Sequence, residues 1–410
     1  MTSTTLFYII ISIIIINFII EKILDFLNAQ QYNDALPKEV SDVYNQKEYL
    51  KSQAYKKVNF KLSNITSLFS LITTLLFFIL NGFEFVDQIA RTLCTNNIII
   101  ALLFFGIIFF SSDIISTPFS YYKTFTIEEK FGFNKSTKKL FWLDKIKGWA
   151  MMIVIGGLVL SLIIWFYEFI GDLFWIYAWG FVALFTLFVN LFYSTLIVPL
   201  FNKQTPLKDG DLKTEIKKFT NKVGFKLDSI FVIDGSKRST KANAYFSGFG
   251  ATKRIVLFDT LINDLNTQEI VAVLAHEVGH YKRKHTVFNL ITSIVLTGFT
   301  FYLLSLFIGN NLLSQALGVS EPSFHIGLIA FGILYSPISQ ITSLIMNVIS
   351  RNFEYQADNY AKEYYGSKPL VSSLKKLSKN SLSNLTPHKA YVFMHYSHPT
   401  LRERILNLNK

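Results

Sequence analysis

Residues 276–280 read His-Glu-Val-Gly-His, two histidines four positions apart with a glutamate directly after the first. An α-helix has about 3.6 residues per turn, so His276 and His280 lie one turn apart on the same face. Two imidazoles in that arrangement can bind one Zn²⁺, and Glu277 can act on water as a general base. Five-residue patterns also arise by chance, so the rest of the chain must support this one.

A zinc hydrolase usually has three protein ligands, so a third ligand must come from another segment. Glu354 opens the stretch Glu-Tyr-Gln-Ala-Asp, and Asp358, four residues later, shares its helix face. One carboxylate can bind the metal while the other accepts a hydrogen bond from a ligating imidazole and fixes its orientation. We therefore expect one zinc ion per chain, bound by His276, His280 and Glu354, with Asp358 behind them.

Two other histidines are weaker candidates for the third ligand. His285 lies five residues beyond His280, and on a continuing helix that spacing turns it away from the metal face. We predict a surface position for His285. His325 falls at the opposite end of a membrane span and is also a poor candidate.

The helix that carries His276 has a recognisable start. Asn266 followed by Glu269 resembles a capping box, and the apolar residues after it form one stripe. Gly279 costs about 1 kcal/mol relative to Ala inside a helix, which suggests a packing or metal-access role.

The surrounding chain is built for a bilayer. Of 410 residues, 51% are hydrophobic and 40 are Phe. A membrane helix needs about 20 apolar residues. Seven candidate spans follow, and the first is short: 6–20, 62–80, 97–116, 149–169, 174–198, 287–309 and 324–350. The single cysteine, Cys94, permits no disulfide within the chain.

The net charge of +12 follows the predicted topology. Basic residues concentrate in alternate connections, at 21–61, 117–148, 199–286 and after 350, while 169–173 and 310–323 carry none. Because basic loops stay on the cytoplasmic side, the N-terminus lies outside and His276 faces the cytoplasm. The charge indicates contact with anionic lipid and requires no nucleic acid.

The pattern divides the chain into four parts. Residues 1–198 hold five spans with two cytoplasmic loops, 199–286 form a cytoplasmic catalytic region, 287–350 hold two spans, and 351–410 form a cytoplasmic C-terminal region. Strands are expected at 229–233, 242–247 and 254–258, with a turn at 248–250 and a polar helix at 351–365.

Several motifs together resemble the CAAX prenyl protease 1 family, the seven-span zinc metallopeptidases of membranes. They are His-Glu-Val-Gly-His, Asn-Ala-Tyr-Phe-Ser-Gly at 243–248, 253–261, Glu354 to Asp358, Ser-His-Pro at 397–399 with Arg404, and the loops at 125–137 and 199–207. Thr400 departs from the family, which usually has a second Pro there. The similarity covers nearly the whole chain.

The resemblance implies a mainly α fold, a polytopic membrane protein with seven transmembrane helices, a small α+β zincin-like catalytic part and a large intramembrane chamber. It implies a zinc metalloendopeptidase that removes the last three residues after a prenylated cysteine. Glu277 is then the base, while His398 and Arg404 are donors to the oxyanion. An extended peptide can pair with the strand that contains Asn243, Ala244, Tyr245 and Phe246.

Two alternatives remain open. A membrane quality-control protease for misfolded or clogged proteins would use the same catalytic residues, so only its substrates would differ. A seven-span scaffold or transporter with a fortuitous zinc motif would bind no zinc. Short loops and the excess of Lys over Arg favour a bacterial inner membrane; in a eukaryote the resemblance implies the endoplasmic reticulum.

Overall fold

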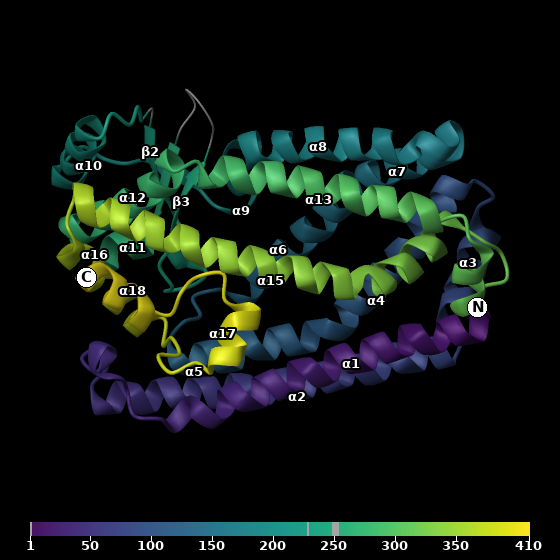
Figure 1. The fold of residues 1–410 in the computed structure, drawn as a ribbon, viewed down its shortest axis with the longest axis horizontal. Coiled ribbons are helices and arrows are strands. Elements are labelled where there is room, and N and C mark those ends of the chain that lie inside the picture. Colours follow the sequence, from purple (N-terminus) through teal and green to yellow (C-terminus); the bar gives the residue numbers. More distant parts are fainter. Residues whose placement is uncertain (1, 228, 248–253) are drawn as a thin grey trace.

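Long helices dominate the computed structural model, which describes residues 2–227, 229–247 and 254–410 (Figure 1). In the described part of the chain, six helical stretches are long and apolar enough to cross a membrane. They are Ser3–Asn33, Gln46–Ile79, Asn97–Phe131, Lys138–Phe201, His285–Phe307 and Phe324–Tyr364. The chain is thus an integral, multi-pass membrane protein with a mainly helical fold.

One of these stretches, Lys138–Phe201, covers two of the predicted spans. A 3-10 turn at Gly171–Leu173 interrupts it, and Gly171 adopts a φ of 71° that suits glycine. The helices on either side, α7 (Gly157–Ile170) and α8 (Phe174–Phe192), pack against each other. The stretch begins with α6 (Lys138–Met151) and ends with α9 (Val198–Phe201), and π-helical turns at Met152–Gly156 and Tyr193–Ile197 join them to α7 and α8.

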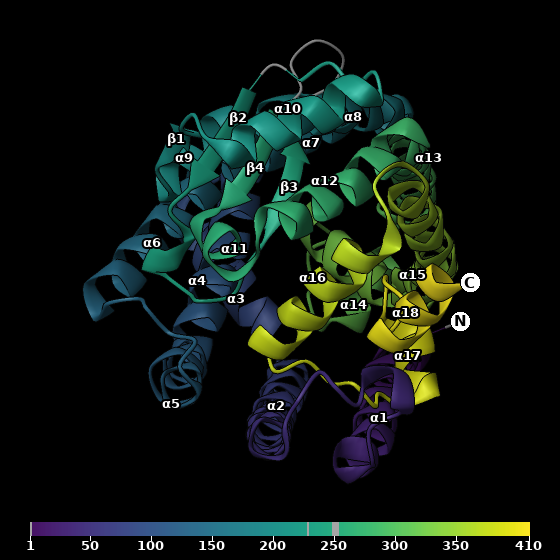
Figure 2. The ribbon, with the colours of Figure 1, turned by 90° about the vertical axis from the view of Figure 1, so that its left-hand side faces the viewer.

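The long helices contact one another in a closed order when viewed along the molecule (Figure 2). They are α1 (Ser3–Gln30), α2 (Gln46–Ile79), α3 (Gly82–Leu93), α4 (Asn97–Tyr122), α7, α8, α13 (His285–Phe307) and α15 (Phe324–Tyr364), which returns to α1. Few of their residues are buried. In α2, for example, burial is confined to Ser52, Gln53, Lys56 and Phe78.

The two largest hydrophobic clusters of the described residues lie at opposite ends of this ring. Near the N-terminus, α3, α14 (Asn311–Ala316) and the ends of α1, α4 and α15 share a core that contains Phe104 and Ile326. At the other end, α10 (Asp211–Lys222), α11 (Asp259–Asp264), α12 (Thr267–Lys282) and α16 (Ser367–Asn380) pack together. The short helices α5 (Glu129–Phe131), α17 (Lys389–His395) and α18 (Leu401–Asn409) complete this end.

A four-stranded sheet lies beside α12 in the order β1-β2-β4-β3. The strands are β1 (Gln204–Pro206), β2 (Ser229–Ile233), β3 (Ala244–Ser247) and β4 (Arg254–Phe258). β2 and β4 are parallel, and the outer strands run antiparallel to them. The three predicted strands are present, β1 was not predicted, and the predicted turn at 248–250 lies outside the described residues.

Candidate metal centre

Helix α12 carries His276, Glu277 and His280 and begins at the predicted capping box. Asn266 Oδ1 accepts a hydrogen bond from the Glu269 N–H, and Glu269 Oε2 accepts one from the Asn266 N–H, each at 2.9 Å. The predicted apolar stripe of α12 is fully buried in the surrounding core: Ile270, Val271, Leu274 and Val278. Burial of this stripe fixes the rotation of α12 and therefore the direction in which its histidines point.

Helix α15 supplies the two carboxylates. The polar helical stretch predicted at 351–365 is helical, and it continues the last span as one helix, α15, from Phe324 to Tyr364. It packs closely on α12 because Gly279 has no side chain. A Cβ built on Gly279 would lie 3.0 Å from Tyr360 Cβ and 3.1 Å from the Ala357 backbone. The packing role predicted for Gly279 is confirmed.

Three side chains converge where α12 and α15 meet. Nε2 of His276 lies 3.2 Å from Nε2 of His280, and Glu354 Oε1 lies 3.2 Å from His280 Nε2. One ligand atom from each of these residues falls within 4.8 Å of the others. His276 and Glu354 are buried, whereas His280 is half-buried. The geometry places the three predicted ligands around one point.

These residues fit a zinc ion. Two imidazole nitrogens and one carboxylate are a donor set that catalytic zinc uses, and they leave a coordination position open. Glu354 Oε2 is buried, and among the described residues it finds no hydrogen-bond partner. His276 Nε2 and Arg404 Nη1 each lie 3.5 Å from this oxygen without a hydrogen bond. A buried carboxylate oxygen that receives no hydrogen bond is costly, so a metal cation between the three side chains would satisfy it more fully.

Asp358 and Arg404 form a second layer behind His276. Asp358 Oδ1 lies 2.8 Å from His276 Nδ1, and the Arg404 guanidinium donates to both Asp358 oxygens at 2.6 and 2.9 Å. Burial and the Arg404 charge lower the pKa of His276, but the hydrogen bonds to Asp358 and Glu354 outweigh both effects and raise the pKa to about 9. Without metal, His276 therefore holds a proton that zinc binding must displace.

His285 is not on the surface, and that prediction was wrong. Its side chain is buried, and its Nδ1 lies 3.0 Å from His280 Nδ1. The prediction assumed that one helix continues past His280. Instead α12 ends at Lys282, Lys284 takes a φ of 60°, and α13 starts at His285. His325 lies elsewhere, paired with Asp87 at 2.7 Å.

Glu277 and His398 are the groups beside the ligands that remain accessible. Glu277 is half-buried, and no described side chain donates a hydrogen bond to it. His398 is 63% exposed, and its Nε2 lies 3.3 Å from Glu354 Oε1. By contrast Arg404, predicted as an oxyanion donor, pairs with Asp358, lies 3.5 Å from Glu354 Oε2 and has only 12% of its side chain exposed.

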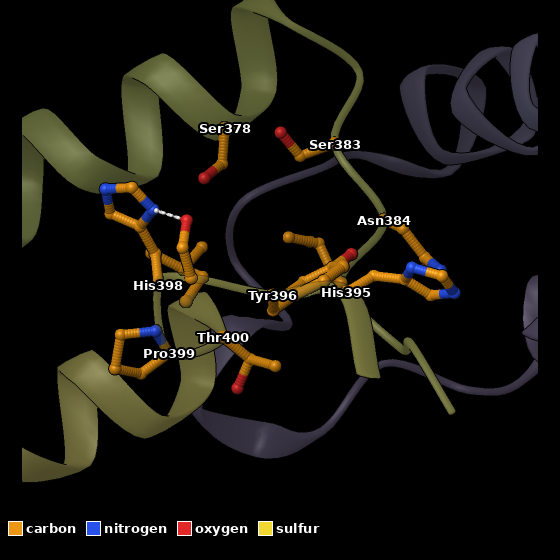
Figure 3. Close-up of a pocket in the computed structure, with 11 residues that line it drawn as sticks. Ser378, Ser383, Asn384, His395, Tyr396, His398, Pro399 and Thr400 are labelled. Carbon is orange, nitrogen blue, oxygen red and sulfur yellow. Dashed lines mark hydrogen bonds between the residues drawn. The ribbon is translucent and has the colours of Figure 1, made fainter. Parts of the chain in front are cut away.

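His398 also forms part of the wall of a polar pocket of about 400 Å³. Figure 3 shows the ring beside Ser378, with a hydrogen bond to the Ser397 hydroxyl at 3.0 Å. The other lining residues come from the loops before and after α17, the last residue of α17 and the first of α18: Ser383, Asn384, Leu385, His395, Tyr396, Pro399, Thr400 and Leu401. The pocket thus opens next to the ligand cluster.

The predicted substrate strand, β3, is an edge strand of the described sheet. Ala244, Tyr245 and Phe246 pair with β4 on one side only. Asn243 directly precedes β3. Its side-chain oxygen accepts a hydrogen bond from the Ala244 N–H at 2.9 Å, and its carbonyl accepts one from the Phe258 N–H. None of the contacts found for Asn243 in the described structure reaches the metal ligands.

A charged anchor that the sequence analysis missed holds the segment leading into β3. Lys241 donates to Glu128 at 2.9 Å, and Tyr55 donates to the same carboxylate at 2.5 Å. Nearby, Arg238 pairs with both oxygens of Asp144 at 2.7 Å. Glu128 stands in the 125–137 motif, which was assigned only as a loop. Its two partners, Tyr55 and Lys241, come from distant segments, so no local spacing reveals them.

Comparisons with known proteins agree with this architecture. Residues 25–203 match the family model "CAAX prenyl protease N-terminal, five membrane helices", and residues 206–410 match "Peptidase family M48". The chain is 40% identical to a CAAX prenyl protease 1 homolog of Dictyostelium discoideum, over 92% of this chain and 89% of that protein. It is 35% identical to CAAX prenyl protease 1 of Saccharomyces cerevisiae, over 96% and 93% of the two chains.

A solved structure shows the same fold. The crystal structure of S. mikatae Ste24p matches with a TM-score of 0.94 and 35% sequence identity, over 99% of both chains. The resemblance inferred from the motifs is therefore confirmed over the full length, and the chain belongs to peptidase family M48, within the CAAX prenyl protease 1 family.

Proposed function

We propose that this protein is a zinc-dependent endopeptidase whose ligands are His276, His280 and Glu354. The convergence of these three side chains beside the accessible Glu277 carries the proposal. A scaffold with a fortuitous motif would not account for a set of three ligands that two helices, distant in sequence, bring together.

Each residue has a distinct role in the proposed reaction. When bound, zinc supplies a Lewis acid that polarises the scissile carbonyl and makes water more acidic. Glu277 removes a proton from the attacking water and delivers it to the leaving amine. His398, exposed beside Glu354, donates a hydrogen bond to the oxyanion. Arg404 holds Asp358, and Asp358 orients His276.

The proposed substrate is a peptide bound in extended form along the free edge of β3. An edge strand offers unpaired N–H and C=O groups, and a peptide that pairs with them is held in register. Asn243, at the entrance of this strand, orients the peptide. The pocket beside His398 takes the residues on one side of the scissile bond, because about 400 Å³ is within the range of ligand sites.

The names of the relatives point to the class of peptide. We propose that the chain cleaves after a prenylated cysteine near a protein's C-terminus, releasing the last three residues. The relatives named above are eukaryotic, which favours the endoplasmic reticulum over the bacterial inner membrane as the location.

The proposal includes the way the site sits in the membrane. Counting α7 and α8 separately gives seven spans, with the catalytic region at 199–286 and the C-terminal region at 351–410 on the cytoplasmic side. The closed order of weakly buried helices between two end cores supports an internal chamber. A prenylated peptide could reach the metal through such a chamber without leaving the lipid.

The test is Glu277→Gln in full-length, zinc-loaded protein. Zinc content stays at one ion per chain, while cleavage of a prenylated peptide falls by roughly 10²- to 10⁴-fold, the usual contribution of a general base. Glu363→Gln, the same change at an exposed position of α15, serves as the control. Full activity of Glu277→Gln would refute its role as the base.

An unmodified peptide of the same sequence separates the two protease interpretations. Preference for the prenylated peptide supports processing at prenylated cysteines. Equal cleavage of both would instead favour the quality-control alternative, which needs no lipid on its substrates.

A further inference from the structure

His285 occupies a buried position directly behind one of the proposed zinc ligands. Its side chain is 3% exposed, and its ring stacks on Phe353 with centroids 4.0 Å apart and planes 9° from parallel. Phe353 immediately precedes the ligand Glu354 on α15. His285 is therefore held rigidly between the start of α13 and the segment that carries the third ligand.

A chain of hydrogen bonds links this residue to both ligand helices. His285 Nδ1 lies 3.0 Å from His280 Nδ1, and His285 Nε2 lies 3.1 Å from Gln356 Oε1. A glutamine oxygen only accepts hydrogen bonds, so His285 Nε2 must carry the hydrogen. The Nδ1 atom of a neutral His285 is then an acceptor, and His280 Nδ1 must be the donor.

The opposite arrangement is incompatible with metal binding. If the Gln356 amide nitrogen faced His285, the donor direction along the chain would reverse, and the hydrogen of His280 would move to Nε2. That nitrogen points at His276 and Glu354, and a protonated nitrogen cannot bind a metal. Only the orientation with Oε1 toward His285 leaves His280 Nε2 free.

We propose that His285 is a positioning residue for zinc, holding His280 in the tautomer and orientation that expose Nε2, with Gln356 as its anchor. This inference rests on the proposed zinc site. It gives the second histidine ligand the kind of partner that Asp358 provides for the first. Ligating histidines usually donate their other ring N–H to such a partner.

The two partners differ in charge, which affects the metal. His276 faces a carboxylate, whereas His280 faces a neutral imidazole. A carboxylate partner raises the basicity of a ligating imidazole more than a neutral one does. With Glu354 and Asp358 already anionic beside the site, a neutral acceptor behind His280 orients the ring and adds no further negative charge.

The experiment compares His285→Phe with His285→Asn in full-length protein in detergent. Phe keeps a ring that can stack on Phe353 but removes the acceptor. Asn loses the ring but keeps an oxygen at the position of Nδ1. Zinc affinity is measured by competition with a chelator, and thermal unfolding is measured on the metal-free forms.

For His285→Phe we expect zinc binding to weaken by roughly 10- to 100-fold, the usual effect of losing such a partner. Asn should recover much of that loss, while the metal-free melting temperatures do not follow the same order. If His285→Phe fails to fold, Gln356→Leu replaces it as the test variant. Leu removes the acceptor of the His285 Nε2 hydrogen bond and should therefore weaken zinc binding.

Two results would overturn the inference: unchanged zinc affinity in His285→Phe (or in Gln356→Leu where it is used), or equal losses in the Phe and Asn variants. His280→Ala distinguishes failure of the underlying site. If His280→Ala retains zinc, the ligand assignment itself is wrong. If it loses zinc while His285→Phe does not, only the positioning role fails.

Discussion

Replacing Gly279 with alanine tests how closely α12 and α15 must approach for the site to form. Alanine should favour the helix by about 0.8–1 kcal/mol. The added Cβ, however, would lie 3.0 Å from Tyr360 Cβ and 3.1 Å from the Ala357 backbone. Carbon atoms prefer about 3.5–4.0 Å, so the two helices must separate by roughly 0.5 Å.

That displacement matters more for the metal than for the fold. Overpacking costs about 1–3 kcal/mol, which the helix propensity of alanine partly offsets, so metal-free stability should fall by at most about 2 kcal/mol. Zinc–ligand distances tolerate only about 0.2 Å. Because Ala357 lies between Glu354 and Asp358, both carboxylates move with it. We expect zinc binding to weaken about tenfold or more, equivalent to about 1.4 kcal/mol.

The assay is chelator competition on Gly279→Ala beside Gly332→Ala. Gly332 lies on the other helix of the contact, α15, and a Cβ built there meets no atom within 4 Å. The control should therefore bind zinc like the wild type. Equal zinc affinity in Gly279→Ala and Gly332→Ala would refute the reasoning that close helix contact sets the position of Glu354.

Two further predictions concern buried charges near the site. Glu269 is buried and accepts hydrogen bonds from Ser372 and Lys376 at 2.6 and 2.8 Å, so Glu269→Gln should lower the free energy of unfolding by about 1–2 kcal/mol at neutral pH. Burial alone would raise the pKa of Glu269, but the hydrogen bonds from Lys376 and Ser372 hold it below the usual value of about 4.3. The contribution of the Glu269 carboxylate to stability is therefore complete above that pH and is lost as the pH falls through the folded-state pKa. Thermal unfolding measured at neutral pH and again at a pH below the folded-state pKa should show the melting temperatures of the wild type and the variant converging in acid. A difference between them that persists in acid would contradict this. Arg404→Met removes the arginine partner of the fully buried Asp358 carboxylate and leaves it only His276, so it should cost about 3–5 kcal/mol, with Arg404→Lys intermediate. A Met variant as stable as the wild type in a denaturation assay would show that the arginine pair is not needed.

The sequence was most informative where one helix defines the geometry. His276 and His280 share a helix, as do Glu354 and Asp358, so a spacing of four residues was enough to orient each pair. The strand at 229–233 was predicted from its alternating pattern, and the other two from their place on either side of a glycine-containing turn; β3 begins two residues later than predicted, at Ala244. The bounds of β2 and β4 were predicted as observed, because both strands pair with neighbours over their whole length.

The predictions failed where the structure depends on a feature that carries no local sequence signal. Lys284 adopts a left-handed conformation, and this single residue returns His285 to the ligand cluster. The three-residue strand β1 is too short for an alternating pattern to reveal. The partners of Glu128 come from distant segments, and only the folded chain brings them together.

The unbroken helix α15 makes a zinc ligand part of a membrane span. Pro337 lies within this helix, 17 residues before Glu354, a lever arm of about 26 Å at 1.5 Å per residue. A pivot of about 1° at that point displaces Glu354 by roughly 0.4 Å, more than zinc coordination tolerates. Helices tilt when bilayer thickness changes, so lipid forces act directly on this lever. We therefore expect the tight contact at Gly279 to hold the Glu354 end of α15 in place and to limit how far lipid fluctuations move the proposed zinc site.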